Sequence, residues 1–167
     1  MSTAYANEAL LAAGSEQGTK RKRDGQSEDD GEETAQKLLA AGADNYGYTP
    51  LIRATRIGKT DDVKALLDEG ADTGARDNDG WPALMVACAM GHIEIAQMLL
   101  AALADKDAKD NDGLTALMLA SYHGHTEIAQ MLLVAGADKE ANNDNGDTAL
   151  ILANDNGHAD IVAMLTA

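Results

Sequence analysis

The stretch Ile95-Ala96-Gln97-Met98-Leu99-Leu100 occurs a second time as Ile128-Ala129-Gln130-Met131-Leu132-Leu133, 33 residues later. Two glycine positions recur with the same spacing over four successive segments, and a fixed period of this length is typical of repeat architectures. We therefore interpret the chain as an array of stacked units. The two glycine columns are Gly47, Gly80, Gly113 and Gly146, and Gly58, Gly91, Gly124 and Gly157.

Each unit predicts two short helices. Thr49 can accept hydrogen bonds from the free N–H groups of a helix start, and Pro50 suits the first helical position because no N–H is needed there. Glycines such as Gly58 permit the left-handed conformation that ends a helix. A second helix follows at once, with apolar residues at helical spacing in the repeated stretch. Segments rich in Asp, Asn and Gly, such as 76–80, then predict hairpin turns.

These motifs resemble the ankyrin repeat. Tyr48-Thr49-Pro50-Leu51-Ile52 is similar to the opening of the family's first helix, the Gly-His pairs to its central turn, and the Gly-Ala-Asp runs to the end of its second helix. The resemblance covers residues 44–167. It implies an all-α repeat solenoid of stacked helix-turn-helix units with β-hairpin connections.

The same resemblance suggests how the chain is divided. Leu38 lies twenty residues after Gly18, whereas Leu66 lies eight after Gly58, so the first unit would carry a charged insertion at about 19–31. An atypical terminal unit is expected because one of its sides faces water. We expect an atypical N-terminal repeat at 1–46 and four ankyrin repeats at 47–79, 80–112, 113–145 and, truncated, 146–167.

Three residues depart from the repeat pattern. Leu103 stands where other units have glycine, and because a left-handed leucine costs about 1 kcal/mol, we expect this turn to differ from its neighbours. Pro82 replaces a capping threonine, which predicts a weaker helix start. Asp62 replaces an apolar residue of the second helix, which predicts a looser edge there.

The net charge of −15 is unevenly distributed. Residues up to 76 carry ten basic and fourteen acidic side chains, whereas from residue 77 onward three lysines accompany fourteen acids. Such acidity repels phosphate backbones, so we expect no nucleic-acid partner. Neither a signal-peptide pattern nor an apolar run of about 18 residues is present, and the single cysteine, Cys88, fits a reducing compartment. We expect an intracellular, cytoplasmic protein that binds no membrane.

Lys20-Arg21-Lys22-Arg23 is the one dense basic cluster. Import receptors recognise clusters of this kind, so it is a candidate nuclear-import signal. The alternative is a solvated loop in which these cations and the acids at 28–33 simply maintain solubility. The sequence leaves both interpretations open.

No catalytic or metal-binding constellation stands out. An EF-hand loop at the Asp-Asn-Asp-Gly run would need an acid at Ala108 and a glutamate at Leu119, and neither is present. His123 and His125 lack further zinc ligands nearby, and Cys88 lacks a partner histidine. We therefore expect no enzymatic activity, no cofactor and no metal.

The family resemblance places partner binding on the concave face, formed by the hairpin tips and the exposed sides of the first helices. This set includes the only Trp and two of the four Tyr, which are residue types enriched at interfaces. The alternative is that Trp81 folds over its own hairpin and Met90 fills a neighbouring gap. The expected partner-binding residues are Tyr48, Arg56, Ile57, Trp81, Met90, Leu114, Tyr122, His123, Asp147 and Asp155.

We accordingly expect a monomeric interaction module or adaptor that binds an unidentified protein partner through this groove. Two alternatives remain at this point. The array could be an accessory domain or fragment of a larger enzyme or channel, because ankyrin arrays often accompany such domains. It could also be a recently duplicated array without a strong partner. The native mass of the protein in its source cell would test the fragment hypothesis.

Overall fold

The computed structural model describes residues 36–167. Residues 36–40 are helical, and eight further helices follow in pairs. The proposed insertion at about 19–31 and the basic cluster Lys20–Arg23 lie outside the described residues. The helices are α3 (Pro50–Arg56), α4 (Thr60–Asp68), α5 (Ala83–Met90), α6 (Ile93–Ala101), α7 (Ala116–His123), α8 (Thr126–Val134), α9 (Ala149–Asp155) and α10 (Ala159–Thr166).

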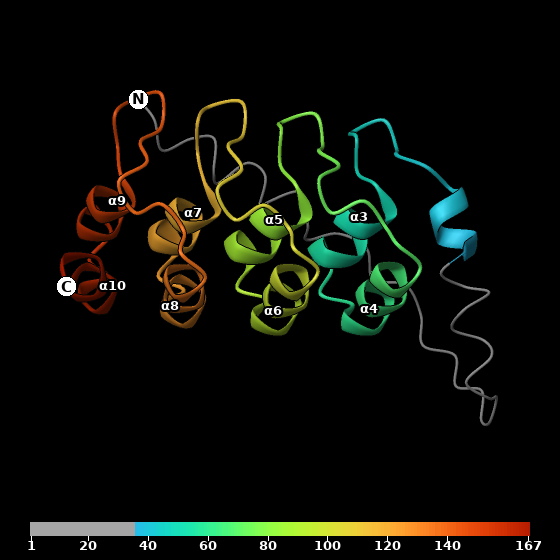
Figure 1. The fold of residues 1–167 in the computed structure, drawn as a ribbon. Coiled ribbons are helices and arrows are strands. Elements are labelled where there is room, and N and C mark those ends of the chain that lie inside the picture. The colour runs from blue at the N-terminus through green and yellow to red at the C-terminus, as the bar shows by residue number, and fades with distance from the viewer. Residues whose placement is uncertain (1–35) are drawn as a thin grey trace. The chain divides into compact units, whose positions relative to one another are not determined.

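The helices are arranged in two rows, with a third row of hairpin loops above them in Figure 1. Helices α3, α5, α7 and α9 pack on one another in chain order, and α4, α6, α8 and α10 do the same. Each first helix also packs on the second helix that follows it. Units that contact only their neighbours define a solenoid, so the predicted all-α repeat fold is confirmed.

The connections between units are hairpin loops. Two isolated antiparallel bridges occur, between Arg76 and Pro82 and between Asn142 and Thr148, and residues 36–167 contain no longer β-strand. The loops therefore behave as hairpins whose geometry is set by side-chain hydrogen bonds more than by strand pairing.

Threonine side chains cap three of the four first helices. Thr49 Oγ1 accepts a hydrogen bond from the Ile52 N–H at 3.3 Å, and Thr115 Oγ1 accepts one from Met118 at the same distance. Thr148 caps α9 in the same way. Pro82 provides no side-chain cap for α5, as its sequence predicts, although the helix still forms over eight residues.

Two features favour glycine at the position after the first helix in the central units. Gly91 and Gly124 have φ values of 76° and 75°, in the left-handed region that disfavours other residues. The histidine of the next unit also packs directly against each of them. A Cβ atom on Gly124 would lie 2.5 Å from Cε1 of His158, and one on Gly91 would lie 2.7 Å from Cε1 of His125.

Leu103 adopts the left-handed conformation itself, with φ 60°. Its N–H donates to Leu100 O at 3.0 Å and that of Ala104 to Leu99 O at 3.0 Å, which is the pattern found around Gly136. The expectation that this turn differs from its neighbours was wrong. The hydrogen bonds and the burial of Ala104 hold the turn in place. The strain lies in the backbone of Leu103, whose side chain is 89% exposed.

Small side chains let the first helices approach closely. Ala87, Ala120 and Ala153 are completely buried at equivalent positions between neighbouring first helices. Asp62 occupies the place that Ile95 fills in the next unit, but its side chain stays one-third exposed and lies 3.4 Å from Lys59 Nζ. This edge of α4 is therefore polar, and its expected looseness stays a prediction.

Candidate functional site

An Asp or Asn at the same position shapes each hairpin loop. Oδ1 of Asp110 accepts hydrogen bonds from the N–H groups of Asp112 and Leu114, at 2.9 and 2.8 Å. Equivalent pairs of bonds fix the other three loops. The four turn residues are Asp44, Asp77, Asp110 and Asn143.

Burial raises the pKa of the Asp77 and Asp110 carboxyl groups, and the backbone N–H donors lower it only in part. The ionised form of these two side chains is thus disfavoured by the fold. Asn143 makes the same backbone contacts without a charge, so the turn requires an oxygen acceptor and not a carboxylate.

Hydrogen bonds also join each loop to the next. Asn78 Nδ2 donates to Asn45 O at 3.1 Å, and Asn111 Nδ2 donates to Asn78 O at 3.0 Å. Lys109 Nζ donates to Asn142 O at 2.8 Å, and Arg76 Nη1 donates to the Lys109 carbonyl. The loops consequently form a row held in register, which is a suitable frame for a preorganised binding surface.

Trp81 connects two of these loops. Its indole Nε1–H donates to Asp110 Oδ2 at 2.8 Å, and its ring is half-buried against the core. The ring therefore reaches toward the next hairpin, where it gains a partner that lies outside its own loop. This bond fixes the ring orientation while part of the ring remains accessible.

Tyr122 and His123 form the second aromatic group on this side. The two rings meet edge-to-face with centroids 4.9 Å apart, and the His123 ring stacks on that of His125 at 5.9 Å. Burial lowers the pKa of His123, and the nearby His125 and His158 lower it further. His123 is therefore neutral at pH 7, and its ring contacts that of the half-buried Tyr122.

A third group lies at the N-terminal end of the array. The rings of Tyr46 and Tyr48 stack with centroids 5.7 Å apart, and the Arg56 guanidinium lies 5.0 Å from the Tyr48 ring centroid. Tyr46 is 68% exposed and Ile57 is 61% exposed. Sequence reasoning included Tyr48, Arg56 and Ile57 but missed Tyr46.

A signal for Tyr46 was available in the repeat itself. Its equivalents one and two periods later are Asp79 and Asp112, both turn residues with polar side chains. The turn does not require a tyrosine at this exposed tip, because the equivalent turns form with aspartate. Such a departure from the repeat indicates a role at the surface.

The remaining predicted residues are less distinctive. Met90 and Leu114 are half-buried and pack against the core, so each is both a scaffold contact and part of the surface. Asp147 Oδ2 lies 3.3 Å from Asn143 Nδ2 within its own hairpin. Asp155 is exposed near the C-terminal end of α9.

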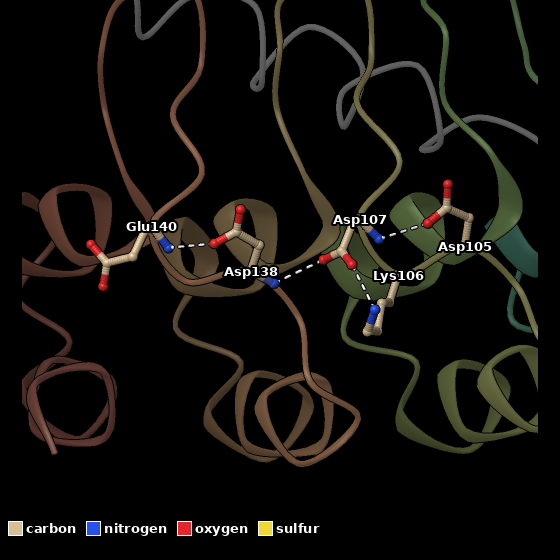
Figure 2. Close-up of polar contacts among 5 residues, drawn as sticks. All are labelled: Asp105, Lys106, Asp107, Asp138 and Glu140. Atoms are coloured by element: carbon tan, nitrogen blue, oxygen red, sulfur yellow. Dashed lines mark hydrogen bonds and ion pairs between the residues drawn. The ribbon is translucent and has the colours of Figure 1, made fainter.

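An acidic cluster occurs at the loops that follow the second helices, and Figure 2 shows its contacts. Asp107 Oδ1 accepts the Asp138 N–H at 2.8 Å, which joins two units, and Oδ2 contacts Lys106 Nζ at 2.6 Å. Burial alone would raise the pKa of Asp107, but these two donors lower it overall. The carboxylates of Asp105 and Asp138 accept backbone N–H groups of their own turns. The cluster therefore has a structural explanation.

Catalytic and metal chemistry finds little support in the described part of the chain. Cys88 is completely buried, and burial raises the pKa of its thiol far above the usual range. Nε2 of His125 and Nε2 of His158 lie 3.1 and 3.0 Å from the Ala89 and Tyr122 carbonyl oxygens. Among residues 36–167, no three His, Cys, Asp or Glu side chains converge as a metal site.

The family model described as "Ankyrin repeats (3 copies)" matches residues 26–110 and 101–167. The chain belongs to the ankyrin-repeat family. Ankyrin repeats generally mediate protein–protein interaction and are typically non-enzymatic. A search of the curated proteins finds no match. No helix in residues 36–167 is long and apolar enough to cross a membrane.

Proposed function

We propose that this ankyrin array is an adaptor that binds one protein partner through the groove face, which we define as the hairpin tips together with those residues of α3, α5, α7 and α9 that are not buried. The observation that carries this proposal is the placement of Trp81 and Tyr122. Both rings are partly accessible, and both are held by neighbours, Asp110 in one case and His123 in the other. Binding through such fixed rings loses little conformational freedom.

The row of hydrogen-bonded hairpins supports the same function. Because each loop is joined to the next, a partner would meet a surface whose shape exists before binding. Aromatic side chains on a rigid frame are frequent hot spots of protein interfaces. The mechanism we infer is surface presentation by a monomer, without covalent chemistry.

The repeats themselves suggest how to test the groove face. Trp81→Leu introduces the residue that stands at position 114, and Tyr122→Ala introduces the residue that stands at position 89. Each replacement is thus already accommodated by an equivalent unit, so the double variant should fold. We expect a partner isolated from cell extract with the native chain to bind the double variant at least about thirtyfold more weakly, because the loss of even one hot-spot aromatic costs about 2 kcal/mol.

Leu103 and Val134 provide a matched control. Both are large, apolar and exposed, and both lie at the ends of second helices, away from the groove face. The double variant Leu103→Ala, Val134→Ala should bind the partner as the native chain does. Equal binding by all three proteins, with circular dichroism showing that each is folded, would exclude the groove face as the site. Light scattering would check the expected monomer.

A further inference from the structure

The N-terminal end of the groove face differs in chemistry from the rest. We define the N-terminal patch as Tyr46, Tyr48, Arg53, Arg56 and Ile57. The tyrosine at its hairpin tip, Tyr46, and its cation–π pair, Tyr48 and Arg56, have no equivalents at the same positions of the later units. At the positions of Tyr46, Arg53 and Ile57 the next unit has Asp79, Val86 and Met90.

Three of these residues share one side of α3. Arg56 and Ile57, the latter just after the last residue of α3, lie three and four residues after Arg53, so each is next to Arg53 on the helix surface. Two of the three equivalents of Arg53, Val86 and Leu119, are buried, and the third, Leu152, is half-buried, whereas Arg53 is exposed. Among residues 36–167, no carboxylate lies within ion-pair distance of the Arg53 guanidinium.

The aromatic half of the patch is already organised. Tyr46 stacks on Tyr48, and Tyr48 carries the Arg56 guanidinium on its ring. Burial raises the pKa of Tyr48, and so do the nearby carboxylates of Asp77, Asp79 and Asp44. Arg56 offsets this increase only in part. The phenol therefore remains a neutral hydrogen-bond donor at physiological pH. Oδ1 of Asp44 and Oδ1 of Asp77 accept the N–H groups of their own turns, and the Arg56 charge also lowers the pKa of Asp77 in part.

Charge distinguishes this end of the array from the other. Residues 36–76 carry six basic and six acidic side chains, whereas residues 77–167 carry three basic and fourteen acidic ones. A segment rich in carboxylates would be repelled along most of the array and tolerated only here. Electrostatic complementarity of this kind selects a partner and fixes its orientation more than it adds affinity.

We propose that the N-terminal patch docks an acidic peptide segment that also carries an aromatic or aliphatic anchor. The carboxylates lie against Arg53 and Arg56, and the anchor packs on Tyr46 and Ile57. The inference rests on the proposed protein-binding function and assigns that function a class of partner and an end of the groove face.

The test uses the whole chain and a synthetic probe. The probe is a Glu-rich peptide with a central Trp-Leu pair, and two further peptides of the same length replace every Glu by Gln or by Lys. We expect the Glu peptide to bind more tightly than the other two in fluorescence anisotropy titrations and to shift the amide NMR signals of residues 46–57. Its affinity should fall as salt is added.

Single substitutions locate the contact. Arg53→Glu should weaken binding of the Glu peptide about fivefold, because an exposed ion pair is lost and replaced by repulsion. Tyr46→Asp, which introduces the residue found at position 79, should weaken it about tenfold. Lys64→Glu makes the same change of charge on the exposed side of α4 and should leave the affinity nearly unchanged.

Two results would overturn the proposal. One is the absence of a preference for the Glu peptide over the Gln and Lys peptides, including no binding of any of them. The other is binding of the Glu peptide that survives Arg53→Glu and Tyr46→Asp but is lost in the Trp81→Leu, Tyr122→Ala variant. The second result would leave the proposed function standing and move its site to the central repeats.

Discussion

Segments 80–112 and 113–145 can be compared directly, because they have the same backbone fold and most of the same core residues. Leu84 and Met85 are buried to the same extent as their equivalents Leu117 and Met118. The larger changes lie at the hairpin tip, at the end of the first helix and in the loop after the second. The equivalent pairs are Trp81 and Leu114, Ala89 and Tyr122, Met90 and His123, and Leu103 and Gly136.

The comparison shows which differences are independent and which are coupled. Trp81 at one tip is matched by Asp110 in the next hairpin, whose Oδ2 accepts the indole N–H. Leu114 has no N–H to donate from its side chain, and the next hairpin there has Asn143, whose Nδ2 contacts Asp147 instead. A tip residue and the turn residue one unit later therefore have to be considered together.

The largest effect should come from a feature that both segments share, the glycine packed against a histidine. Gly124→Ala forces a side chain into the left-handed region and places its Cβ 2.5 Å from the His158 ring. We expect a loss of about 3 kcal/mol in the free energy of unfolding, measured by urea denaturation.

Gly157 is the matched control for this prediction. It has nearly the same φ, 76°, but no atom lies near its missing Cβ. Gly157→Ala should therefore cost only about 1 kcal/mol. Equal losses in the two variants would show that the histidine contact adds nothing to the requirement for glycine.

The coupling between tip and turn should give the second largest effect. Asp110→Asn keeps an oxygen for the backbone N–H groups but can place an amide N–H₂ group opposite the Trp81 indole N–H. We expect a loss of about 1 kcal/mol, because a half-buried donor is left without its acceptor. The double variant Asp110→Asn, Trp81→Leu should recover most of this lost stability, because it reproduces the combination of Leu114 and Asn143 found one unit later.

Asp77→Asn provides the comparison within the same row of hairpins. No indole bonds to Asp77, and its raised pKa shows that the fold disfavours its charge. The free energy of unfolding should change by less than about 0.5 kcal/mol. A large loss in Asp77→Asn would mean that the turn itself requires a carboxylate, and the explanation for Asp110 would then fail.

The sequence predicted the parts of this molecule that recur. Capping threonines, terminal glycines and buried alanines recur at the same positions in most units, because the units pack in the same way, and the period of 33 residues reveals them. The missing side-chain cap at Pro82 was likewise predicted from a departure at a scaffold position.

The contacts that make the candidate site distinctive were not predictable in the same way. The Trp81–Asp110 bond and the Tyr46–Tyr48–Arg56 group depend on single residues, so no period reveals them. The conformation of Leu103 was misjudged because propensity disfavours it, whereas two backbone hydrogen bonds and the burial of Ala104 outweigh that preference.

Leu103 offers a comparable effect of opposite sign. Leu103→Gly introduces the residue of the equivalent turn and relieves the strained φ of 60°. Because the leucine side chain is exposed, little packing is lost, and we expect a gain of about 1 kcal/mol in thermal or urea unfolding. Leu103→Ala keeps the strained Cβ and should gain almost nothing. If Leu103→Ala stabilised the chain as much as Leu103→Gly, the effect would come from removal of the exposed side chain and not from the backbone.

The smallest effect is a dependence on pH caused by a histidine that only the second of the two segments has at this position. His123 has a lowered pKa in the folded chain, caused first by burial and then by His125 and His158, while the equivalent residue in the other segment is Met90. Acidification below the unfolded value of about 6.5 therefore protonates the unfolded chain first. The stability that His123 contributes is fully present above that value and decreases as the pH falls.

His123→Met removes the titrating group and introduces the side chain that the equivalent position already accommodates. We expect the native chain to lose more stability than this variant between about pH 7 and about pH 5, by a margin smaller than the effects above. The relevant quantity is the difference between the two slopes, since the substitution also changes packing at every pH. Parallel slopes would show that the other histidines account for any acid sensitivity, and that burial of His123 is as easily tolerated in its charged form.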